Sequence, residues 1–444
     1  MQISGAWRLA ARVFLPFAVG YYLSYLFRTI NALIASHLSS DARLGAADLG
    51  LLTSVYFLVF AAAQIPVGVL LDRFGPRRVQ SPLLLLAAVG AGVFAVSTGF
   101  LSLLIARAMI GLGVAAALTA GLKSIILWFP RERVALLNGY MVMLGSLGAV
   151  TATTPVEHLL AWMGWRQLFE ILAAATGATA ILIYVVVPER RIVPSIASTP
   201  ATLGSVFRDR RFWRIAPLSA TCIGSAWSLQ GLWASPWLID VEGLDRESLV
   251  GHLFTMSIVL SCGAWLFGTT VHHIRRRGLG AETVLATVAV LFMAAESTLI
   301  LRAPLPSILP WSVVAIAGTA TVVSFAVIAD YFPTELAGRA NGALNVLHFG
   351  WAFLAQCATG LILEQWSAND GHRPLQAYQV AFGLNVALQI AALVWFALPG
   401  RRSITPWMSS ILFSKPADDS CAVEPVGLYE DLVILLPVHD DAEW

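Results

Sequence analysis

Apolar residues fall along this chain in long blocks separated by short polar stretches. Each block holds about 18 to 25 residues, which is long enough to cross a hydrocarbon core of roughly 30 Å. No water reaches the backbone at that depth, so each block must satisfy its own hydrogen bonds and is expected to be a helix. The pattern predicts twelve such helices, near residues 13–36, 47–71, 80–100, 102–128, 136–160, 165–188, 213–238, 248–271, 281–301, 307–331, 337–364 and 376–398.

The composition agrees with this pattern. Of 444 residues, 58% are hydrophobic and only 12% are charged, against roughly 25% charged residues in an ordinary soluble domain. The sequence therefore predicts an all-α membrane protein whose main partner is the lipid bilayer, with no nucleic acid bound. The first block is expected to be an uncleaved helix rather than a signal peptide, because Arg28 interrupts its apolar run.

The basic residues predict the orientation. Cytoplasmic loops of membrane proteins carry an excess of Lys and Arg. With both termini in the cytoplasm, most of the 28 Lys and Arg residues fall in cytoplasmic segments. The loops on the other side hold few of them, namely Arg43, Arg166, Arg246, Arg302 and Arg373. A multi-pass protein of a cell inner membrane, with both ends cytoplasmic, is the expectation.

The two halves of the chain repeat one another. An aromatic pair precedes Pro130 and again Pro333, and Asn138 and Asn341 are each followed by glycine. Two related six-helix units are typical of transporters that bind their substrate at mid-membrane, between the units. The predicted organisation is a first six-helix bundle over residues 1–190, a cytoplasmic linker over 191–211, a second six-helix bundle over 212–400 and a cytoplasmic tail over 401–444. The tail is expected to be mostly disordered, with a docked regulatory segment as the alternative.

A glycine- and arginine-rich motif stands between the second and third blocks. Its marked positions are Gly68, Asp72, Arg73, Gly75, Arg77 and Arg78. Gly68 permits close approach of another helix, Asp72 closes the helix end, and Gly75 with Pro76 makes a tight turn. The spacing resembles the signature G-x-x-x-D-R-x-G-x-R-R of the major facilitator superfamily. In the fourth block Arg107 is followed by Gly111 and Gly113, which resembles another signature of that superfamily.

The resemblance implies a fold and a function class. The implied fold is twelve transmembrane helices in two pseudo-symmetric six-helix bundles, working as a monomer without cofactor or metal. The glycine- and arginine-rich loop would be a conformational latch on the cytoplasmic side. Arg107 would belong either to a structural charge network or to the coupling machinery. An enzyme is not expected, because the chain has no H-E-x-x-H zinc pair and no G-x-S-x-G nucleophile elbow.

Arg28 is the main candidate for substrate binding. An arginine near mid-membrane costs a few kcal/mol or more, so it normally faces a cavity or a partner. Tyr21, Tyr25, Arg28 and Asn31 recur at helical spacing and form a polar and aromatic stripe. A guanidinium can bind a carboxylate or phosphate through two parallel hydrogen bonds. The alternative is that Arg28 pairs with a carboxylate of another helix.

The run from Gly20 to Arg28 is similar to the first helix of the organophosphate and organic-anion branch of the superfamily. In that branch the matching arginine contacts the anionic substrate. Its phosphate exchangers carry a second arginine on the seventh helix. The seventh block here has no cation at that place and carries Trp227, Ser228, Gln230 and Trp233. A monoanion with an apolar or amphipathic body is therefore the expected substrate. The predicted substrate-binding residues are Arg28, Tyr21, Tyr25, Asn31, Gln230, Trp233, Asn345 and His348.

Three residues are candidates for proton coupling, namely Glu170, Glu296 and His348. An unpaired carboxylate is costly in an apolar segment, and a histidine titrates near neutral pH. His348 is either functional or a satisfied packing residue. The predicted function is a secondary active transporter that takes up a small organic anion together with protons. The alternatives are a proton-driven exporter of drugs or metabolites and a receptor that binds without translocating.

Overall fold

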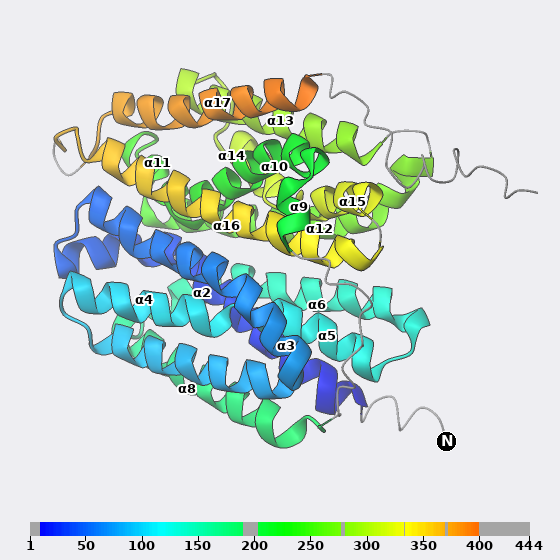
Figure 1. Ribbon diagram of the computed structural model, residues 1–444. Coiled ribbons are helices and arrows are strands. Elements are labelled where there is room, and N and C mark those ends of the chain that lie inside the picture. The colour runs from blue at the N-terminus through cyan, green and yellow to red at the C-terminus, as the bar shows by residue number, and fades with distance from the viewer. Residues whose placement is uncertain (1–8, 190–202, 277–279, 333, 369–371, 399–444) are drawn as a thin grey trace, which may run out of the picture. The chain divides into compact units, whose positions relative to one another are not determined.

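The computed structural model describes residues 9–189, 203–276, 280–332, 334–368 and 372–398 (Figure 1). In the first half the elements are η1 (Ala10–Phe14), α2 (Leu15–Ala42), α3 (Ala46–Val96), α4 (Phe100–Val114), α5 (Ala117–Trp128), α6 (Arg131–Thr151), α7 (Thr154–Leu160) and α8 (Trp165–Val186). In the second half they are α9 (Leu203–Arg208), α10 (Arg210–Ser228), η2 (Leu229–Trp233), α11 (Ala234–Asp240), α12 (Arg246–Arg276), α13 (Ala281–Leu301), α14 (Ile308–Ala317), α15 (Thr321–Tyr331), α16 (Thr334–Leu363) and α17 (Leu375–Ala397). The predicted tail and most of the predicted linker lie outside the described residues, so the domain boundaries stay a prediction.

The chain is an all-helical membrane protein, as the sequence predicts. Within the described residues, 10 helices are long and apolar enough to cross a membrane. One of them, α3, covers both the second and the third predicted segments. The seventh predicted segment, which runs through α10, η2 and α11, is not among the 10, because it is less apolar than those helices. Counting α3 twice and adding the seventh segment reconciles the 10 helices with the twelve predicted crossings.

The turn between the two arms of α3 depends on Gly75. This residue has φ 83° and ψ 164°, which lies outside helical geometry. A side chain at positive φ is strained for residues other than glycine. Gly75 therefore reverses the chain between the two arms, where the sequence predicts a tight turn.

The sequence repeat marks the same helix break in both halves. The N–H of Phe129 donates to the carbonyl of Ile125 at 3.0 Å, and the N–H of Phe332 donates to that of Ile328 at 3.0 Å. Both phenylalanines have extended backbones that end a helix, α5 in the first half and α15 in the second. The two halves thus share a local backbone pattern.

Helices α3 and α16 form a main contact between the halves. In Figure 1 the blue and cyan helices of the first half lie together, and α16 (yellow) lies beside α3. We call the end of the bundle that carries residues 43–45, between α2 and α3, the first-loop end, and the end that carries Gly75 the latch end.

Candidate functional site

Arg28 lies among aromatic rings from both halves of the protein. Its guanidinium carbon is 4.0 Å from the ring centroid of Trp227, 5.4 Å from Tyr25, 5.6 Å from Phe349 and 5.8 Å from Phe57. Tyr25 belongs to α2, Phe57 to α3, Trp227 to α10 and Phe349 to α16. These five residues are called the Arg28 cluster below. Each of these distances is within the range at which a cation is attracted by an aromatic face.

No carboxylate of the described chain pairs with Arg28. Its charge is opposed by aromatic faces alone, since the ion pairs of the described residues involve other cations. A cation–π contact contributes about 0.5–2 kcal/mol and leaves the positive charge of the guanidinium without a counter-charge. The side chain is half-buried, so it is also open to a ligand. Among the described residues, the alternative of a fixed carboxylate partner is not supported.

Tyr21 packs against Tyr25 of the Arg28 cluster. Its ring meets that of Tyr25 edge to face, with centroids 5.2 Å apart. A Cβ at Gly145 of α6 would collide with the Tyr21 ring, so α6 fits against α2 only because this position has no side chain. Tyr21 is buried against Tyr25, and a direct contact with substrate stays a prediction.

Asn31 faces Arg107 rather than the Arg28 cluster. With the carboxamide oxygen turned toward the guanidinium, Asn31 accepts from both Nη2 and Nε of Arg107. Arg107 also donates to the carbonyl of Phe27 at 2.8 Å and lies 4.7 Å from the ring of Tyr56. Arg107 is 1% exposed. Of its two predicted roles, the geometry fits the structural network, and a substrate contact of Asn31 stays a prediction.

Gln230 and Trp233 lie in the π-helix η2, which interrupts the seventh crossing. Single π-helical turns inside α-helices are frequent at functional sites. Trp233 donates from Nε1 to the carbonyl of Gln356 at 3.2 Å, across to α16. The Nε2 of Gln230 is buried without a hydrogen-bond partner in the described chain. It lines a small cavity with Thr29 and Thr153 of the first half.

Asn345 and His348 lie on α16 but differ in their surroundings. The amide of Asn345 donates to Oε1 of Gln64 on α3 at 3.4 Å, which joins the two halves. His348 is 0% exposed, and its Nε2 is 2.7 Å from the hydroxyl of Ser219 on α10. The ring of His348 also meets Trp227 edge to face at 6.0 Å. His348 thus contacts the Arg28 cluster through Trp227, and a role in substrate binding or proton coupling stays a prediction.

The two carboxyl candidates for proton coupling are placed very differently. Glu170 is exposed on α8. Glu296 is 0% exposed within the second half and accepts two hydrogen bonds from amide side chains. Neither residue belongs to the Arg28 cluster.

At the first-loop end, the halves are joined by charged groups. The carboxylate of Glu364, which follows α16, accepts from the N–H groups of Ala46 at 2.7 Å and Ala47 at 3.2 Å. These are the first N–H groups of α3, where a helix favours negative charge. Arg246 of α12 pairs with both oxygens of Glu157 on α7, at 2.8 and 2.6 Å. The first-loop end is therefore closed in this conformation.

At the latch end, the predicted latch residues form contacts within the first half. Lys123 pairs with Asp72 at 2.5 Å, Arg78 pairs with Glu189, and the Arg77 guanidinium carbon is 5.0 Å from the Tyr184 ring. The helix break lies at Gly75, three residues after Asp72. No atom of the described chain lies within 4 Å of a Cβ at Gly68, so the close helix approach expected there is absent from this conformation.

The second half has its own polar cluster at the latch end. Arg214 pairs with Glu282 at 3.2 Å, and the hydroxyl of Tyr331 donates to the same carboxylate. Burial and the hydrogen bond to Glu282 raise the pKa of Tyr331 above its ordinary value. The tyrosine therefore stays protonated and remains a donor over the physiological range.

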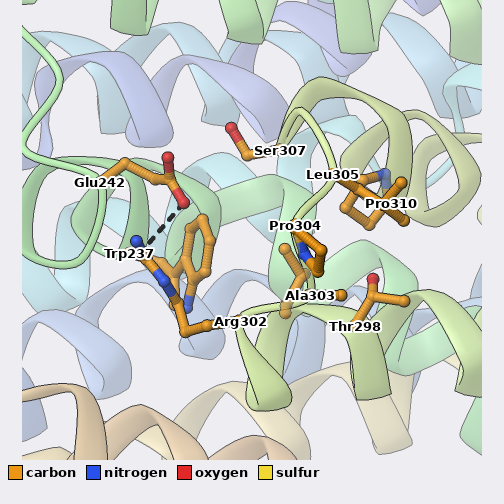
Figure 2. Close-up of a pocket in the computed structure, with 10 residues that line it drawn as sticks. Trp237, Glu242, Thr298, Arg302, Ala303, Pro304, Leu305, Ser307 and Pro310 are labelled. Atoms are coloured by element: carbon orange, nitrogen blue, oxygen red, sulfur yellow. Dashed lines mark ion pairs between the residues drawn. The ribbon is translucent and has the colours of Figure 1, made fainter.

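A pocket of about 260 Å³ opens at the first-loop end, away from the Arg28 cluster (Figure 2). Second-half residues line it, among them Trp237, Ser307 and Pro310. Arg302 crosses one side of it and pairs with Glu242 at 3.1 Å. Because both charges of the pocket neutralise one another, its lining offers no free cation to an anionic solute.

Several residues of the site were not predicted from the sequence. Phe57 and Phe349 belong to the Arg28 cluster, and Gln64 bonds to Asn345, yet none was a candidate. Gln64 carries a usable signal, because it is an isolated amide in an otherwise apolar helix arm. The two phenylalanines carry none, since aromatic residues are common throughout the apolar blocks.

Comparisons with known proteins give the family. The sequence profile of the Major Facilitator Superfamily matches residues 17–356. The hexuronate transporter of Escherichia coli (strain K12) is 24% identical over 415 residues, which cover 87% of this chain and 93% of that protein. The probable sulfoacetate transporter SauU of Cupriavidus necator is 26% identical over 308 residues, which cover 64% of this chain and 70% of that protein.

A solved structure has the same fold. The crystal structure of a bacterial homolog to the human lysosomal transporter Spinster, inward-facing and unoccupied, matches with a TM-score of 0.69. The match covers 89% of this chain and 97% of that chain at 18% identity, so it speaks for the fold alone. The chain belongs to the Major Facilitator Superfamily, and it is a multi-pass membrane transporter rather than an enzyme.

Proposed function

We propose that this protein takes up a small organic monoanion by alternating access, driven by protons. One observation carries the proposal: Arg28 is a cation without a carboxylate partner among the described residues, held between rings of both halves. An anion can bind the guanidinium through paired hydrogen bonds while the aromatic faces cover its apolar part. Since both halves contribute rings, relative movement of the halves would change the site.

The relatives support this substrate class. Their names describe transporters of hexuronate and sulfoacetate. Hexuronate carries one carboxylate and sulfoacetate a carboxylate and a sulfonate, each on a small organic body, and groups of this kind are what Arg28 would bind. Tyr25, Gln230, Trp233 and Asn345 would shape the rest of the site, with Tyr21 and His348 behind it.

The excess of basic residues at the latch end supports an orientation. We place both termini and the latch end in the cytoplasm of a cell with an inner membrane, and the first-loop end outside. The bonds of Glu364 and Arg246 would then close the outer side. The protein would act as a monomer whose two six-helix bundles, residues 1–190 and 212–400, rock about the site.

A thermal-shift experiment tests the substrate class. The purified protein and its Arg28→Ala variant are heated with D-glucuronate, sulfoacetate, benzoate, D-glucose or choline. A ligand at 100 times its dissociation constant stabilises a protein by about 2.7 kcal/mol. We expect at least one anion to stabilise the unmodified protein and not the variant. Arg302→Ala is the matched control, because Arg302 is far from the Arg28 cluster, and it should keep the shift.

Two outcomes would contradict the proposal. Equal stabilisation of the unmodified protein and Arg28→Ala by choline or D-glucose would favour an exporter of drugs or metabolites with a broad apolar site. Binding of an anion without flux in reconstituted vesicles would favour a receptor.

A further inference from the structure

Glu296 is a buried carboxyl group that the anion site does not use. It lies on α13 and is 0% exposed. Its oxygens accept from Nδ2 of Asn385 at 2.6 Å and from Nε2 of Gln389 at 2.5 Å. The two amides are four residues apart on α17 and therefore share one face of that helix. In the described part of the chain no Lys, Arg or His pairs with Glu296.

Amide partners let this carboxyl group exist in two protonation states. A cation beside Glu296 would hold it ionised, because neutralising one member of a buried ion pair is costly. An amide can instead donate to the carboxylate or, after rotation, accept from the protonated acid. Gln389 is suited to this exchange, since its Oε1 is buried without a partner in the described chain. The titratable group that faces Glu296 from α10 is the thiol of Cys222.

Hydrogen bonds connect Glu296 to the helices that carry the Arg28 cluster. The hydroxyl of Ser225 on α10 donates to Oδ1 of Asn385 at 2.7 Å. The Nε1 of Trp351 on α16 donates to the same hydroxyl at 2.9 Å. A continuous chain of polar groups therefore runs from Glu296 to α10 and α16.

The same two helices contact Arg28. Trp227 on α10 and Phe349 on α16 are each two residues from a member of the polar chain. The helices are in near backbone contact at Gly224, where a Cβ would lie 2.7 Å from the carbonyl oxygen of His348. Because the two helices are closely packed at this crossing, a displacement of either helix at Arg28 is expected to move the polar groups that lead to Glu296.

We propose that Glu296 is the proton-binding group of transport. The carboxylate takes one proton from water on one side of the membrane, becomes the neutral acid, and returns the proton as a carboxylate on the other side. Asn385 and Gln389 hold both forms, and Ser225 and Trp351 link the change to the Arg28 cluster. The coupling rests on the proposed anion function, whereas the titration of Glu296 does not.

Infrared difference spectroscopy of the full-length protein in lipid tests this proposal. A protonated buried carboxylic acid gives a C=O stretching band that disappears when the acid ionises. We expect one such band to disappear between about pH 4 and about pH 10, a range that brackets carboxyl pKa values from ordinary to strongly raised ones. The band should be absent from Glu296→Gln and present, with a changed midpoint, in Glu296→Asp. The control Glu247→Gln alters an exposed carboxyl group of α12 and should keep the band.

A second arm separates the proton site from the anion site. The band is recorded with the anion that gives the largest thermal shift, in the unmodified protein and in Arg28→Ala. A midpoint displaced by the anion only in the unmodified protein supports coupling. Persistence of the same titrating band in Glu296→Gln, or no titrating band in the unmodified protein, overturns the proposal. If no anion binds but the Glu296 band titrates, the proposed substrate is wrong and the proton site stands.

Discussion

The guanidinium of Arg28 stacks on the indole of Trp227 at 4.0 Å, although the two residues belong to different halves of the protein. A cation and an aromatic ring attract without hydrogen bonds, so the guanidinium N–H groups stay available to a ligand. The contact also spans the boundary that must move when access alternates. In the proposed function, the pair would serve both the binding of an anion and the coupling of that binding to movement.

Trp227→Leu tests this pair. The substitution keeps an apolar side chain but removes the face on which Arg28 rests, at a cost of about 0.5–2 kcal/mol. We expect the affinity for the anion to fall by about 2-fold to 30-fold, measured by titration calorimetry on the purified protein. Trp162→Leu removes an exposed tryptophan at the first-loop end and is the control. Unchanged affinity in Trp227→Leu would mean that the indole does not position Arg28.

Glu364→Gln tests the closure of the first-loop end. The change removes the charge of the carboxylate that caps α3 across the halves. Charge-assisted bonds are about twice as strong as neutral ones, so a loss of about 1–2 kcal/mol is expected. Such a loss raises the population of the state open at this end by about 5-fold to 30-fold.

Spin labels at Trp162 and Leu305, both exposed near the first-loop end, report that population. In a background without the native cysteines, the pair should show a second, longer distance in Glu364→Gln. Glu247→Gln, an exposed change on α12, should show the original distance alone. If Glu364→Gln gives the same distribution as the control, the cap does not hold the halves together.

Gly148 and Gly139 on α6 form a matched pair for a test of packing. A Cβ at Gly148 would collide with the carbonyl oxygen of Tyr22 and lie 3.0 Å from the backbone nitrogen of Leu26. A Cβ at Gly139 meets no atom of the described chain within 4 Å. Overpacking typically costs 1–3 kcal/mol, whereas alanine in an open helical position gains up to about 1 kcal/mol over glycine.

We therefore expect Gly148→Ala to lower the melting temperature and Gly139→Ala to leave it unchanged or raise it. Differential scanning fluorimetry in one detergent measures both variants. Equal melting temperatures would show that α2 and α6 separate easily and that their close contact does not contribute to stability.

The sequence predicted much of the fold, and it singled out Arg28, whose role stays a prediction. Helix length and apolar blocks are set by bilayer thickness, so the twelve crossings follow from the sequence alone. Arg28 was identifiable because a cation at that depth is costly. Phe57 and Phe349 were not identifiable from the sequence, because they approach Arg28 only when α3 and α16 pack against α2.

The remaining differences also have physical causes. Asn31 shares a helical face with Arg28 in the sequence pattern, but its amide oxygen accepts hydrogen bonds from the buried Arg107. The sequence leaves His348 either functional or a packing residue, and the structure places its Nε2 beside the hydroxyl of Ser219 and its ring edge to face with Trp227. The sequence of one helix does not show these contacts, since a neighbouring helix decides which polar group lies next to each residue.

Gly68 allows a test of the state that this conformation does not show. Its α-carbon faces open space at the latch end, although the motif around it favours close packing against another helix. If that packing occurs when the latch end closes, Gly68→Leu should leave the melting temperature unchanged and reduce the initial rate of anion uptake by vesicles at least 10-fold. A 10-fold change in rate corresponds to 1.36 kcal/mol in the barrier. Gly251→Leu is the control, because a Cβ at Gly251 of α12 also meets nothing within 4 Å, and this variant should transport normally. Normal uptake by Gly68→Leu would show that the latch end closes without approaching this residue.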